Sequence, residues 1–267
     1  MISIPAEFCR EADPLRKKSM GKKQTVSEGV RINKFLASCG LGSRRSCEKI
    51  VEQGGVTING TSVTSLGARV LASDSVKIDG RRVRPPGHVT ILLNKPKGLI
   101  CTKEDTHDRD TIYELLPGRH HRLNYIGRLD KESEGLLLLT SDGELSQQLT
   151  HPKHGVEKEY RVLLDRTVEK EHAEQMLKGI HTAEGIARAE RIEAQGARWI
   201  SVVLKQGLKR QIRIMLGKFD YKVRRLIRVR IGDLIAPDLK AGNWVELEAD
   251  GIELAQTNPR PAAPQRT

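Results

Sequence analysis

The chain has 267 residues, of which 37% are hydrophobic, so it is long enough to bury the core of one or two domains. Lysine and arginine number 46 against 34 acidic residues, and the formal net charge of +12 favours a polyanionic partner, usually nucleic acid. No apolar run approaches the length of a membrane-spanning helix, and no apolar core follows the early lysines. We therefore expect neither membrane contact nor a secretory signal peptide.

The four cysteines indicate a reducing compartment. They show no Cys-x-x-Cys spacing and no accompanying histidine pair, which argues against a disulfide framework and a zinc site. His151 and His154 are three residues apart, but no third candidate ligand stands near them. We expect free thiols, a cytoplasmic location and no bound metal.

The first part of the chain predicts an arm followed by a small domain. Residues 1–30 are polar and charged without a sustained apolar period, and we expect them to be a disordered basic arm. Residues 31–80 show helix and hairpin patterns. Ile32, Phe35 and Leu36 have the i, i+3, i+4 spacing of a helix with one buried face.

A second helix and a hairpin complete this predicted domain. Ser43 is suited to be the N-cap of a helix that buries Cys47. Asn59-Gly60 is a strong hairpin turn. Val76 and Ile78 alternate with polar residues, as expected for a last strand with one buried face.

The excess positive charge is concentrated in this region. Residues 31–87 hold ten basic and four acidic residues, a net charge of +6, whereas residues 88–256 hold 28 basic and 26 acidic residues. A surface of this charge attracts phosphate groups. The basic residues on or between the two predicted helices are Arg31, Lys34, Arg44, Arg45 and Lys49.

Residues 31–63 resemble the S4 RNA-binding domain. The shared features are the pair of helices, the Ser-Arg-Arg turn between them and the hairpin pattern G-x-V-x-x-N-G. The resemblance implies binding to structured RNA through its shape and its phosphates. It also implies that RNA contacts Arg31, Lys34, Arg44 and Arg45.

The rest of the chain predicts a larger α+β domain. Residues 81–88 contain two prolines and a glycine and predict a linker. From residue 89 to residue 256, short apolar strands are mixed with helices, which favours one large sheet. Residues 257–267 are rich in proline and predict a disordered tail. The strongest strand patterns lie at residues 91–93, 136–139, 160–164 and 200–204.

Asp130 stands in a loop between two apolar segments. An aspartate in a charged loop is most often a solvated turn residue. Here, however, the apolar run Leu136–Leu139 follows closely and pins the loop to a buried strand. Arg128 and Lys131 flank the aspartate, a setting that favours an ionised carboxylate beside an anionic ligand.

Residues 127–143 resemble the catalytic motif of pseudouridine synthases, G-R-L-D-x-x-T/S-x-G-L-L-L-L-T-x-D-G, with Ser133 in the Thr/Ser position. The resemblance implies that Asp130 is the catalytic nucleophile and that RNA contacts Arg128 and Lys131. It further implies a catalytic domain with a mixed, mainly antiparallel sheet and a central cleft. The order of S4 domain, linker and catalytic domain is similar to the ribosomal RNA branch named for RsuA.

Two further segments agree with this family. Residues 157–162 resemble its K-x-Y motif, which implies that Tyr160 packs on the target base, although a tyrosine on a strand is more often part of a core. Residues 205–215 resemble its G-x-x-R-Q-I-R-R-M motif, which implies that Arg213 pairs with Asp130. The same motif implies RNA contacts by Lys209, Arg210 and Gln211.

Two residues depart from the family pattern. Ile214 stands where the family has a second arginine, and Asp220 stands where a glycine is common. Neither position carries the expected ion pair, so the departures leave the predicted chemistry intact. They predict a different RNA contact or a different turn at this place.

The resemblance implies a reaction and a substrate. The variants in this chain are most similar to the RluF and RluB types, which act on large-subunit ribosomal RNA; the RluF type is also implicated in modifying a tRNA. An enzyme of this kind extrudes the uridine from its stack. Asp130 then either attacks C1′ of the ribose or removes a ribose proton to give a glycal. Because the uridine is rearranged in place, and no P-loop or dinucleotide-binding glycine pattern occurs, we expect no cofactor.

Two other readings stay open at this point. One is a non-catalytic RNA-binding protein that assists ribosome assembly. The other is a hydrolase with an aspartate nucleophile, which would need a second carboxylate as general acid; Glu132 and Glu134 are near in sequence. We expect a monomer that binds large-subunit ribosomal RNA or its assembly precursor, with a tRNA as the alternative. The sequence does not identify the modified uridine.

Overall fold

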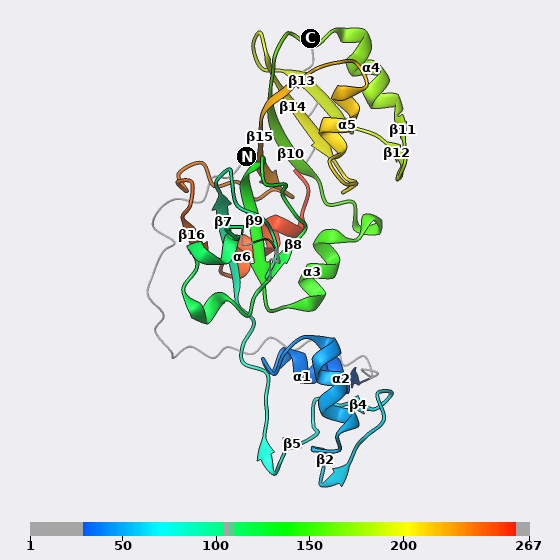
Figure 1. Cartoon of the computed structure of the whole chain (residues 1–267), viewed down its shortest axis with the longest axis vertical. Coiled ribbons are helices and arrows are strands. Elements are labelled where there is room, and N and C mark those ends of the chain that lie inside the picture. The colour runs from blue at the N-terminus through cyan, green and yellow to red at the C-terminus, as the bar shows by residue number, and fades with distance from the viewer. Residues whose placement is uncertain (1–28, 104–106, 108, 260–267) are drawn as a thin grey trace. The chain divides into compact units, whose positions relative to one another are not determined.

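A computed structural model describes residues 29–103, 107 and 109–259 (Figure 1). The chain divides into two compact units, with the boundary between His88 and Val89. The predicted arm lies outside the described residues except for residues 29 and 30, and most of the predicted tail lies outside them as well. No helix in the described ranges is long and apolar enough to cross a membrane.

The smaller unit packs two short helices against short strands. Ser43 caps the second helix by accepting a hydrogen bond from the Ser46 amide at 3.1 Å. Asn59 and Gly60 both have positive φ and form the two-residue turn that the sequence predicts. The elements are β1 (Val30–Arg31), α1 (Ile32–Ser38), α2 (Arg44–Glu52), β2 (Val56–Ile58), β3 (Thr61–Ser62), β4 (Arg69–Val70), β5 (Val76–Ile78) and β6 (Arg81–Arg82).

The boundary of this unit differs from the predicted one. The sequence places residues 81–88 in a linker, but Arg81 and Arg82 form β6, which pairs with β5. The cause is the turn at Asp79, whose φ of 47° reverses the chain, so that the Val83 amide reaches the Val76 carbonyl at 3.0 Å. The sheet therefore continues beyond the predicted end of the domain.

The larger unit is built on one eight-stranded sheet with helices beside it (Figure 1). Its helices are α3 (Gly143–Thr150), α4 (Lys170–Lys178), α5 (Gln211–Gly217) and α6 (Ala249–Gln256), with short 3₁₀ turns at Ile112–Leu115, Gly118–His120 and Pro152–His154. Its strands are β7 (Thr90–Lys95), β8 (Asn124–Ile126), β9 (Glu134–Thr140), β10 (Lys158–Leu164), β11 (Ile180–Thr182), β12 (Gly185–Ala187), β13 (Arg191–Ala194), β14 (Trp199–Leu204), β15 (Val223–Ile231) and β16 (Trp244–Glu246).

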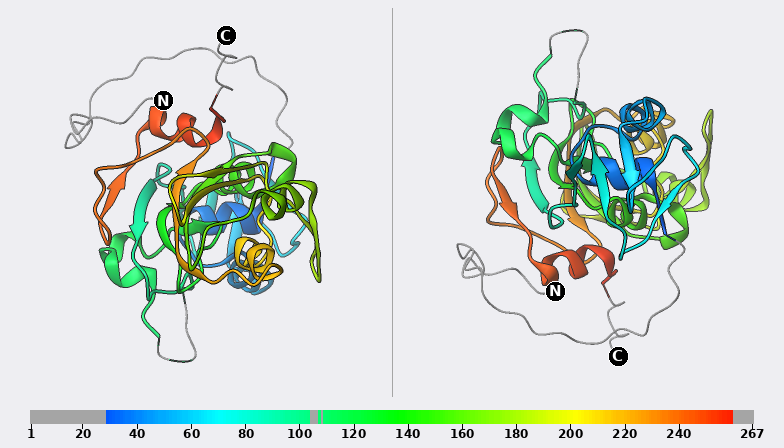
Figure 2. Two further views of the ribbon diagram at one scale, coloured as in Figure 1. Left: turned by 90° about the horizontal axis from the view of Figure 1, so that it is seen from above. Right: turned by 90° about the horizontal axis from the view of Figure 1, so that it is seen from below.

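The strand order of the large sheet is β13-β14-β10-β15-β9-β7-β16, with β8 paired to β9. Figure 2 shows the orange strand β16 beside the teal strand β7 at one edge. Neighbouring strands are antiparallel except β9 and β15, which are parallel. The predicted fold class, α+β with a mixed and mainly antiparallel sheet, is confirmed. The four strongest predicted strands lie within β7, β9, β10 and β14.

Strand β9 changes its partner along one edge. Leu138 to Thr140 pair with β8, whereas Glu134 and Gly135 pair with β15. The loop that joins β8 to β9, residues 127–133, therefore lies at the point where the pairing of β9 changes from β8 to β15. The backbones come so close there that a Cβ on Gly135 would overlap the backbone oxygen and nitrogen of Arg228, and Gly135 has a φ of 103°.

The core of the large unit forms several clusters. One lies around β10, β14, α4 and α5 and includes Val162, Ile200 and Met215. Another lies around β7, β8 and β9 and includes Leu129. Tyr160 packs against both clusters. It therefore connects the two halves of the sheet.

The start of the predicted tail is ordered. The side chain of Asn258 accepts a hydrogen bond from the Glu157 amide at 2.8 Å and donates one to the Gly155 carbonyl at 2.9 Å. These bonds fix residues 257–259 to the segment before β10. The remainder of the tail lies outside the described residues.

Candidate active site

Asp130 lies in the loop between β8 and β9. Gly127 starts this loop with a φ of 66°, a conformation that glycine adopts without steric cost. The Ser133 amide donates to the Asp130 carbonyl at 3.0 Å and tightens the turn, while Leu129 is buried beneath it. The Asp130 side chain is 34% exposed. The backbone of the loop is thus anchored, and the carboxylate remains accessible to a ligand.

A buried lysine supports the loop from below. Lys95, the last residue of β7, has no exposed surface, and its Nζ donates to the carbonyls of Ser133 at 2.8 Å, Pro96 at 3.0 Å and Asp130 at 3.3 Å. Burial lowers the pKa of Lys95, and Cys101, Glu134 and Asp130 act in the opposite direction. The three carbonyls compensate the buried ammonium group and fix the two ends of the Asp130 turn.

The segment after β7 also holds this loop. The Gly98 amide donates to the Lys131 carbonyl at 2.8 Å, and the Cys101 thiol donates to the Leu129 carbonyl at 3.4 Å. The sequence predicts only a basic turn at residues 94–98. The sequence feature that could have indicated the role of Lys95 is its place at the end of an apolar strand, directly before a proline. A lysine side chain at such a position can point into the protein.

The cation paired with the carboxylate of Asp130 differs from the expected one. Arg210 Nη1 lies 3.9 Å from Asp130 Oδ2, a long ion pair. Arg213 instead donates to the carbonyls of Glu132 at 3.1 Å and Val223 at 3.3 Å. Burial lowers the pKa of Arg213, as does the neighbouring Arg210, while Asp130 and Glu132 raise it. The basic segment expected from the resemblance does reach Asp130 through Arg210, but the expected direct pair of Arg213 with Asp130 is not formed.

The loop before α5 positions Arg210. Arg210 has a φ of 53°, which a residue with a Cβ adopts only when its surroundings hold it. The Glu184 side chain accepts from the Lys209 amide at 2.8 Å, and the Gln211 side chain accepts from the Leu208 amide at 3.3 Å. Contacts on both sides of Arg210 thus fix its backbone.

Gln211 is placed differently from its expected RNA contact. It is only 4% exposed, and its side-chain amide donates to the Arg188 carbonyl at 3.1 Å and to Gln206 at 3.0 Å. The glutamine binds the backbone of its own unit because it begins helix α5 inside the protein. The neighbouring Lys209 and Arg210 are exposed, as an RNA contact requires.

Tyr160 lies on β10 at an irregular point of the sheet. The register with β15 shifts between Glu159 and Tyr160, and Tyr160 is then paired with Arg228 on β15. Its ring is partly buried between the two core clusters described above, one of which contains Leu129, the neighbour of Asp130. Tyr160 thus has a structural role in the core and packs against the cluster that contains Leu129, the neighbour of Asp130.

Arg228 is a second buried cation that the sequence does not reveal. It is 2% exposed, and its Nε donates to the Leu136 carbonyl at 2.6 Å. A Cβ on Gly127 would lie 4.0 Å from its Nη1, so the guanidinium stands behind the start of the Asp130 loop. Arg230, on the same strand, is buried as well, so these two arginines of β15 are not available as a surface for RNA.

Other basic residues surround Asp130 at the surface. Arg128 and Lys131 are exposed within its own loop, and Lys97 pairs with Glu132 at 2.9 Å. In the smaller unit Arg31, Arg44 and Arg45 are exposed and Lys34 is partly buried. The expected RNA-contacting cations are therefore mostly accessible, in each unit taken by itself.

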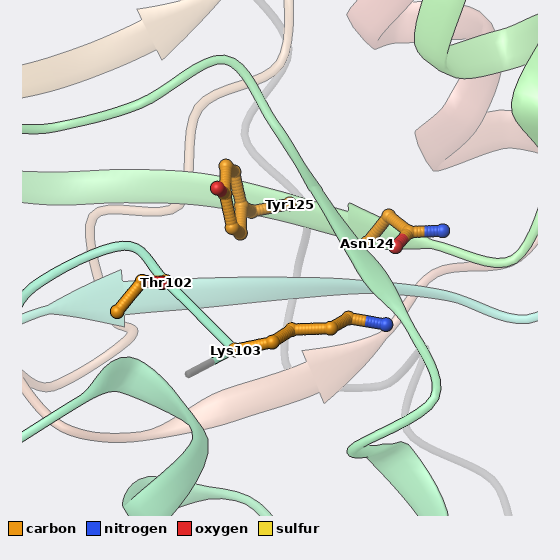
Figure 3. Close-up of a pocket in the computed structure, with 4 residues that line it drawn as sticks. All are labelled: Thr102, Lys103, Asn124 and Tyr125. Atoms are coloured by element: carbon orange, nitrogen blue, oxygen red, sulfur yellow. The ribbon is translucent and has the colours of Figure 1, made fainter. Parts of the chain in front are cut away.

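Two hollows occur in the larger unit. One, of about 520 Å³, is lined by Thr102, Lys103, Asn124 and Tyr125 (Figure 3). Asn124 pairs with Thr140, at the end of the β8–β9 hairpin away from Asp130. The other, of about 170 Å³, includes Arg210 in its lining. Among the described residues no group of three or more histidine, cysteine or acidic side chains is arranged to hold a metal ion.

The chain is similar to known proteins over both units. The family described as RNA pseudouridylate synthase matches residues 89–218, and the S4 domain matches residues 30–76. A protein named uncharacterized RNA pseudouridine synthase from Aquifex aeolicus (strain VF5) is 38% identical over 233 residues, which cover 85% of this chain and 93% of that protein.

Relatives with more specific names are nearly as similar. Ribosomal large subunit pseudouridine synthase B from Yersinia pestis is 37% identical, and the alignment covers 82% of this chain and 73% of that protein. Dual-specificity RNA pseudouridine synthase RluF from Escherichia coli (strain K12) is 35% identical, and the alignment covers 84% of this chain and 77% of that protein. A crystal structure of a pseudouridylate synthase matches with a TM-score of 0.63 and 29% identity, covering 85% of this chain and all of the other.

Proposed function

The chain belongs to the family of RNA pseudouridine synthases with an S4 domain, and we propose that it isomerises a specific uridine of large-subunit ribosomal RNA with Asp130 as its nucleophile. As a member of this family it is an isomerase that converts uridine to pseudouridine in RNA. One observation carries the assignment of Asp130. Its loop is held by the buried Lys95, while its carboxylate is exposed beside Arg210.

The reaction requires that a base be taken out of its stack, at a cost of a few kcal/mol. Phosphate contacts to the exposed cations, among them Arg128, Lys131 and Lys209, supply this free energy. Arg128 enters the gap that the base leaves, and Tyr160 stacks on the extruded uracil. The partly buried ring of Tyr160 supports this role, because a ring fixed by two core clusters loses little conformational entropy when a base packs on it.

In the reaction the bond from C1′ to N1 breaks and a bond from C1′ to C5 forms. Asp130 begins it in one of two ways. It attacks C1′, and the bond from Asp130 to C1′ breaks when C5 bonds to C1′, or it removes the proton from C2′ and returns that proton to C2′ when C5 bonds to C1′. The uracil turns within the site, N1 takes up a proton, and C5 loses its proton after the new bond has formed. Arg210, and Arg213 at longer range, stabilise the charge at Asp130 electrostatically.

The neighbouring carboxylates disfavour a hydrolase. A glycosidase needs a protonated carboxyl group to protonate the leaving group. The hydrogen bond from Lys97 lowers the pKa of Glu132, and the two hydrogen bonds from Arg225 lower the pKa of Glu134. Both groups are therefore ionised near neutral pH. A non-catalytic assembly factor would not need the loop that presents Asp130.

The substrate proposal rests on the relatives. One relative is named for the large ribosomal subunit and another for dual specificity. The alignment with this chain covers more than two thirds of the length of each. A tRNA is the alternative substrate, through the similarity to the RluF type. With ribosomal RNA or its assembly precursor as the substrate, we place the enzyme in the cytoplasm as a monomer.

The proposal is tested with purified protein and a transcript of large-subunit ribosomal RNA, with total tRNA as a second substrate. Wild type yields pseudouridine, whereas Asp130→Asn binds the same RNA within about twofold and yields none. Asp238→Asn, which changes an exposed aspartate of the same unit, keeps full activity. Free uracil as the product would show a hydrolase, and full activity of Asp130→Asn would refute the assigned nucleophile.

A further inference from the structure

The hollow of about 170 Å³ lies between the β11–β12 hairpin and the start of α5. Ala187, Leu208 and Ile214 give it an apolar wall, and Glu184, Lys209 and Arg210 stand at it as charged residues. For comparison, an engineered cavity of about 150 Å³ in another protein holds a benzene ring. The hollow therefore has room for a single aromatic heterocycle.

This hollow adjoins the reacting group. Arg210 lines it, and the same side chain reaches Asp130 at 3.9 Å. A ligand in the hollow therefore shares Arg210 with the nucleophile. The residues Lys209 and Arg210 add positive charge on the exposed side, which suits the phosphates of a chain that continues from the target uridine.

Hydrogen bonds join the two walls. The Lys209 amide donates to the Glu184 side chain at 2.8 Å, and the Gln206 side chain donates to the Ile186 carbonyl at 3.1 Å. Gln206 also accepts from the Arg188 amide at 2.9 Å. The hairpin is thus attached to the loop before α5 at both ends of β12, so the hollow is formed before any ligand arrives.

Ile214 is the unusual residue of this wall. It is 43% exposed, although it is a large hydrophobic residue, and it replaces the second arginine of the family motif. This exposure leaves apolar surface of Ile214 uncovered beside two cations. A flat, apolar ring placed against it would be covered on one face, while the phosphates of that ring's nucleotide reach the cations.

We propose that this hollow holds an unstacked nucleobase of the substrate RNA, a neighbour of the target uridine in the chain. This inference rests on the proposed function and adds a second base-binding site to it. The Glu184 carboxylate favours a base that carries an amino group, since it can accept a hydrogen bond from that group. Recognition of this base would help the enzyme to choose its uridine.

The test compares two isoleucines of the same region. Ile214→Ser removes the apolar wall, and Ile186→Ser is the matched control, because Ile186 is 52% exposed on β12 but does not line the hollow. The probe is a stem-loop transcript carrying the position at which wild-type protein forms pseudouridine. We expect Ile214→Ser to lower kcat/KM by about tenfold, the size of a lost base stack, and Ile186→Ser to change it less than twofold.

Abasic substitution in the RNA identifies the occupant. Removing the base at one position near the target uridine should cause the same loss with wild-type protein and no further loss with Ile214→Ser. Ala183→Trp, which fills the hollow from the hairpin, should reproduce the loss without a change in helix α5. Equal effects of the two isoleucine variants, or additive losses at every abasic position, would overturn the proposal.

The two proposals fail in different ways. If wild-type protein leaves large-subunit ribosomal RNA unmodified, the proposed substrate is wrong, and the same variants are then compared on the tRNA that the enzyme modifies. If ribosomal RNA is modified and no base couples to Ile214, only the second base-binding site is wrong.

Discussion

The residues around Asp130 have different roles in binding and positioning. Lys95 donates all three of its hydrogen bonds to backbone carbonyls, so it fixes the loop and is not available to bind a ligand. Arg210 is half exposed and reaches the carboxylate, whereas Arg213 is largely occupied by the carbonyls of Glu132 and Val223. The two arginines therefore have different roles although they stand on the same basic segment.

This difference predicts different kinetics for two alanine variants. Arg213→Ala removes the guanidinium that links the Asp130 loop to the first residue of β15, so we expect kcat to fall by about 10²-fold or more. Arg210→Ala removes an exposed ion pair and the proposed RNA contact of this residue, and should mainly raise KM, by about tenfold. Single-turnover and steady-state assays with a transcript of the substrate separate the effects. A large loss of kcat in Arg210→Ala with little loss in Arg213→Ala would reverse the roles.

Lys158 of the K-x-Y motif should make stability depend on pH. Burial lowers its pKa from 10.5 to about 8, and its Nζ donates to the carbonyls of Leu149 and Val156. Between these pH values the unfolded chain holds a proton that the folded protein has released, so this residue's contribution to stability rises with pH. The slope is at most about 1.4 kcal/mol per pH unit.

The measurement is denaturant unfolding of wild type and Lys158→Met between pH 7.5 and pH 10. As the pH rises through this window, the free energy of unfolding of wild type should increase relative to that of the variant. The other titrating groups contribute equally to both proteins, so the change in this difference reports on Lys158. A constant difference across the window would mean that Lys158 has an ordinary pKa.

Asp130, Tyr160 and the basic segment were proposed as site residues because the motifs that contain them are long. The sequence gives no distance, so it could not distinguish the roles of Arg210 and Arg213. The resemblance assigned Gln211 to an RNA contact, and the sequence indicated no role for Lys95 or Arg228. Each of the three side chains donates to backbone carbonyls inside the protein.

Among the elements, β9 determines where the site forms. It pairs with β8 at one end and with β15 at the other, and the Asp130 loop occupies the change of partner. The predicted apolar strand at residues 136–139 was correct because its composition alone indicates burial. The change of partner was not predictable, because it depends on β15, which lies about 90 residues away in the chain.

Gly135 gives a direct test of this arrangement. Gly135→Ala places a Cβ against the backbone of Arg228 at a φ of 103°, so we expect a loss of more than about 3 kcal/mol of stability and of catalytic activity with it. Gly143→Ala is the matched control. A Cβ there meets nothing within 4 Å at the start of α3, and stability should change by less than about 1 kcal/mol.

Thermal or denaturant unfolding of both glycine variants provides the readout. If Gly135→Ala unfolds at the same denaturant concentration as wild type, the close approach of β9 and β15 is not required for the fold. The location of the Asp130 loop would then need another explanation.

For the whole molecule, charge and catalysis are distributed over two units. The smaller unit has a net charge of +6 over residues 31–87, and the larger unit carries Asp130. This division suits an enzyme in which one unit supplies phosphate contacts and the other selects and rearranges a base. Charge and motif order predicted the two units, but the boundary was displaced because β6 lies beyond the predicted domain end.

We propose that Asp130 forms pseudouridine at a position of large-subunit ribosomal RNA. The most direct measurement is a pseudouridine map of total RNA from cells in which the gene is intact, deleted or replaced by Asp130→Asn. We expect one large-subunit ribosomal RNA position to lose its pseudouridine in both mutants and to keep it in the intact cells. Persistence of that pseudouridine in the Asp130→Asn cells, or an unchanged map after deletion, would contradict it.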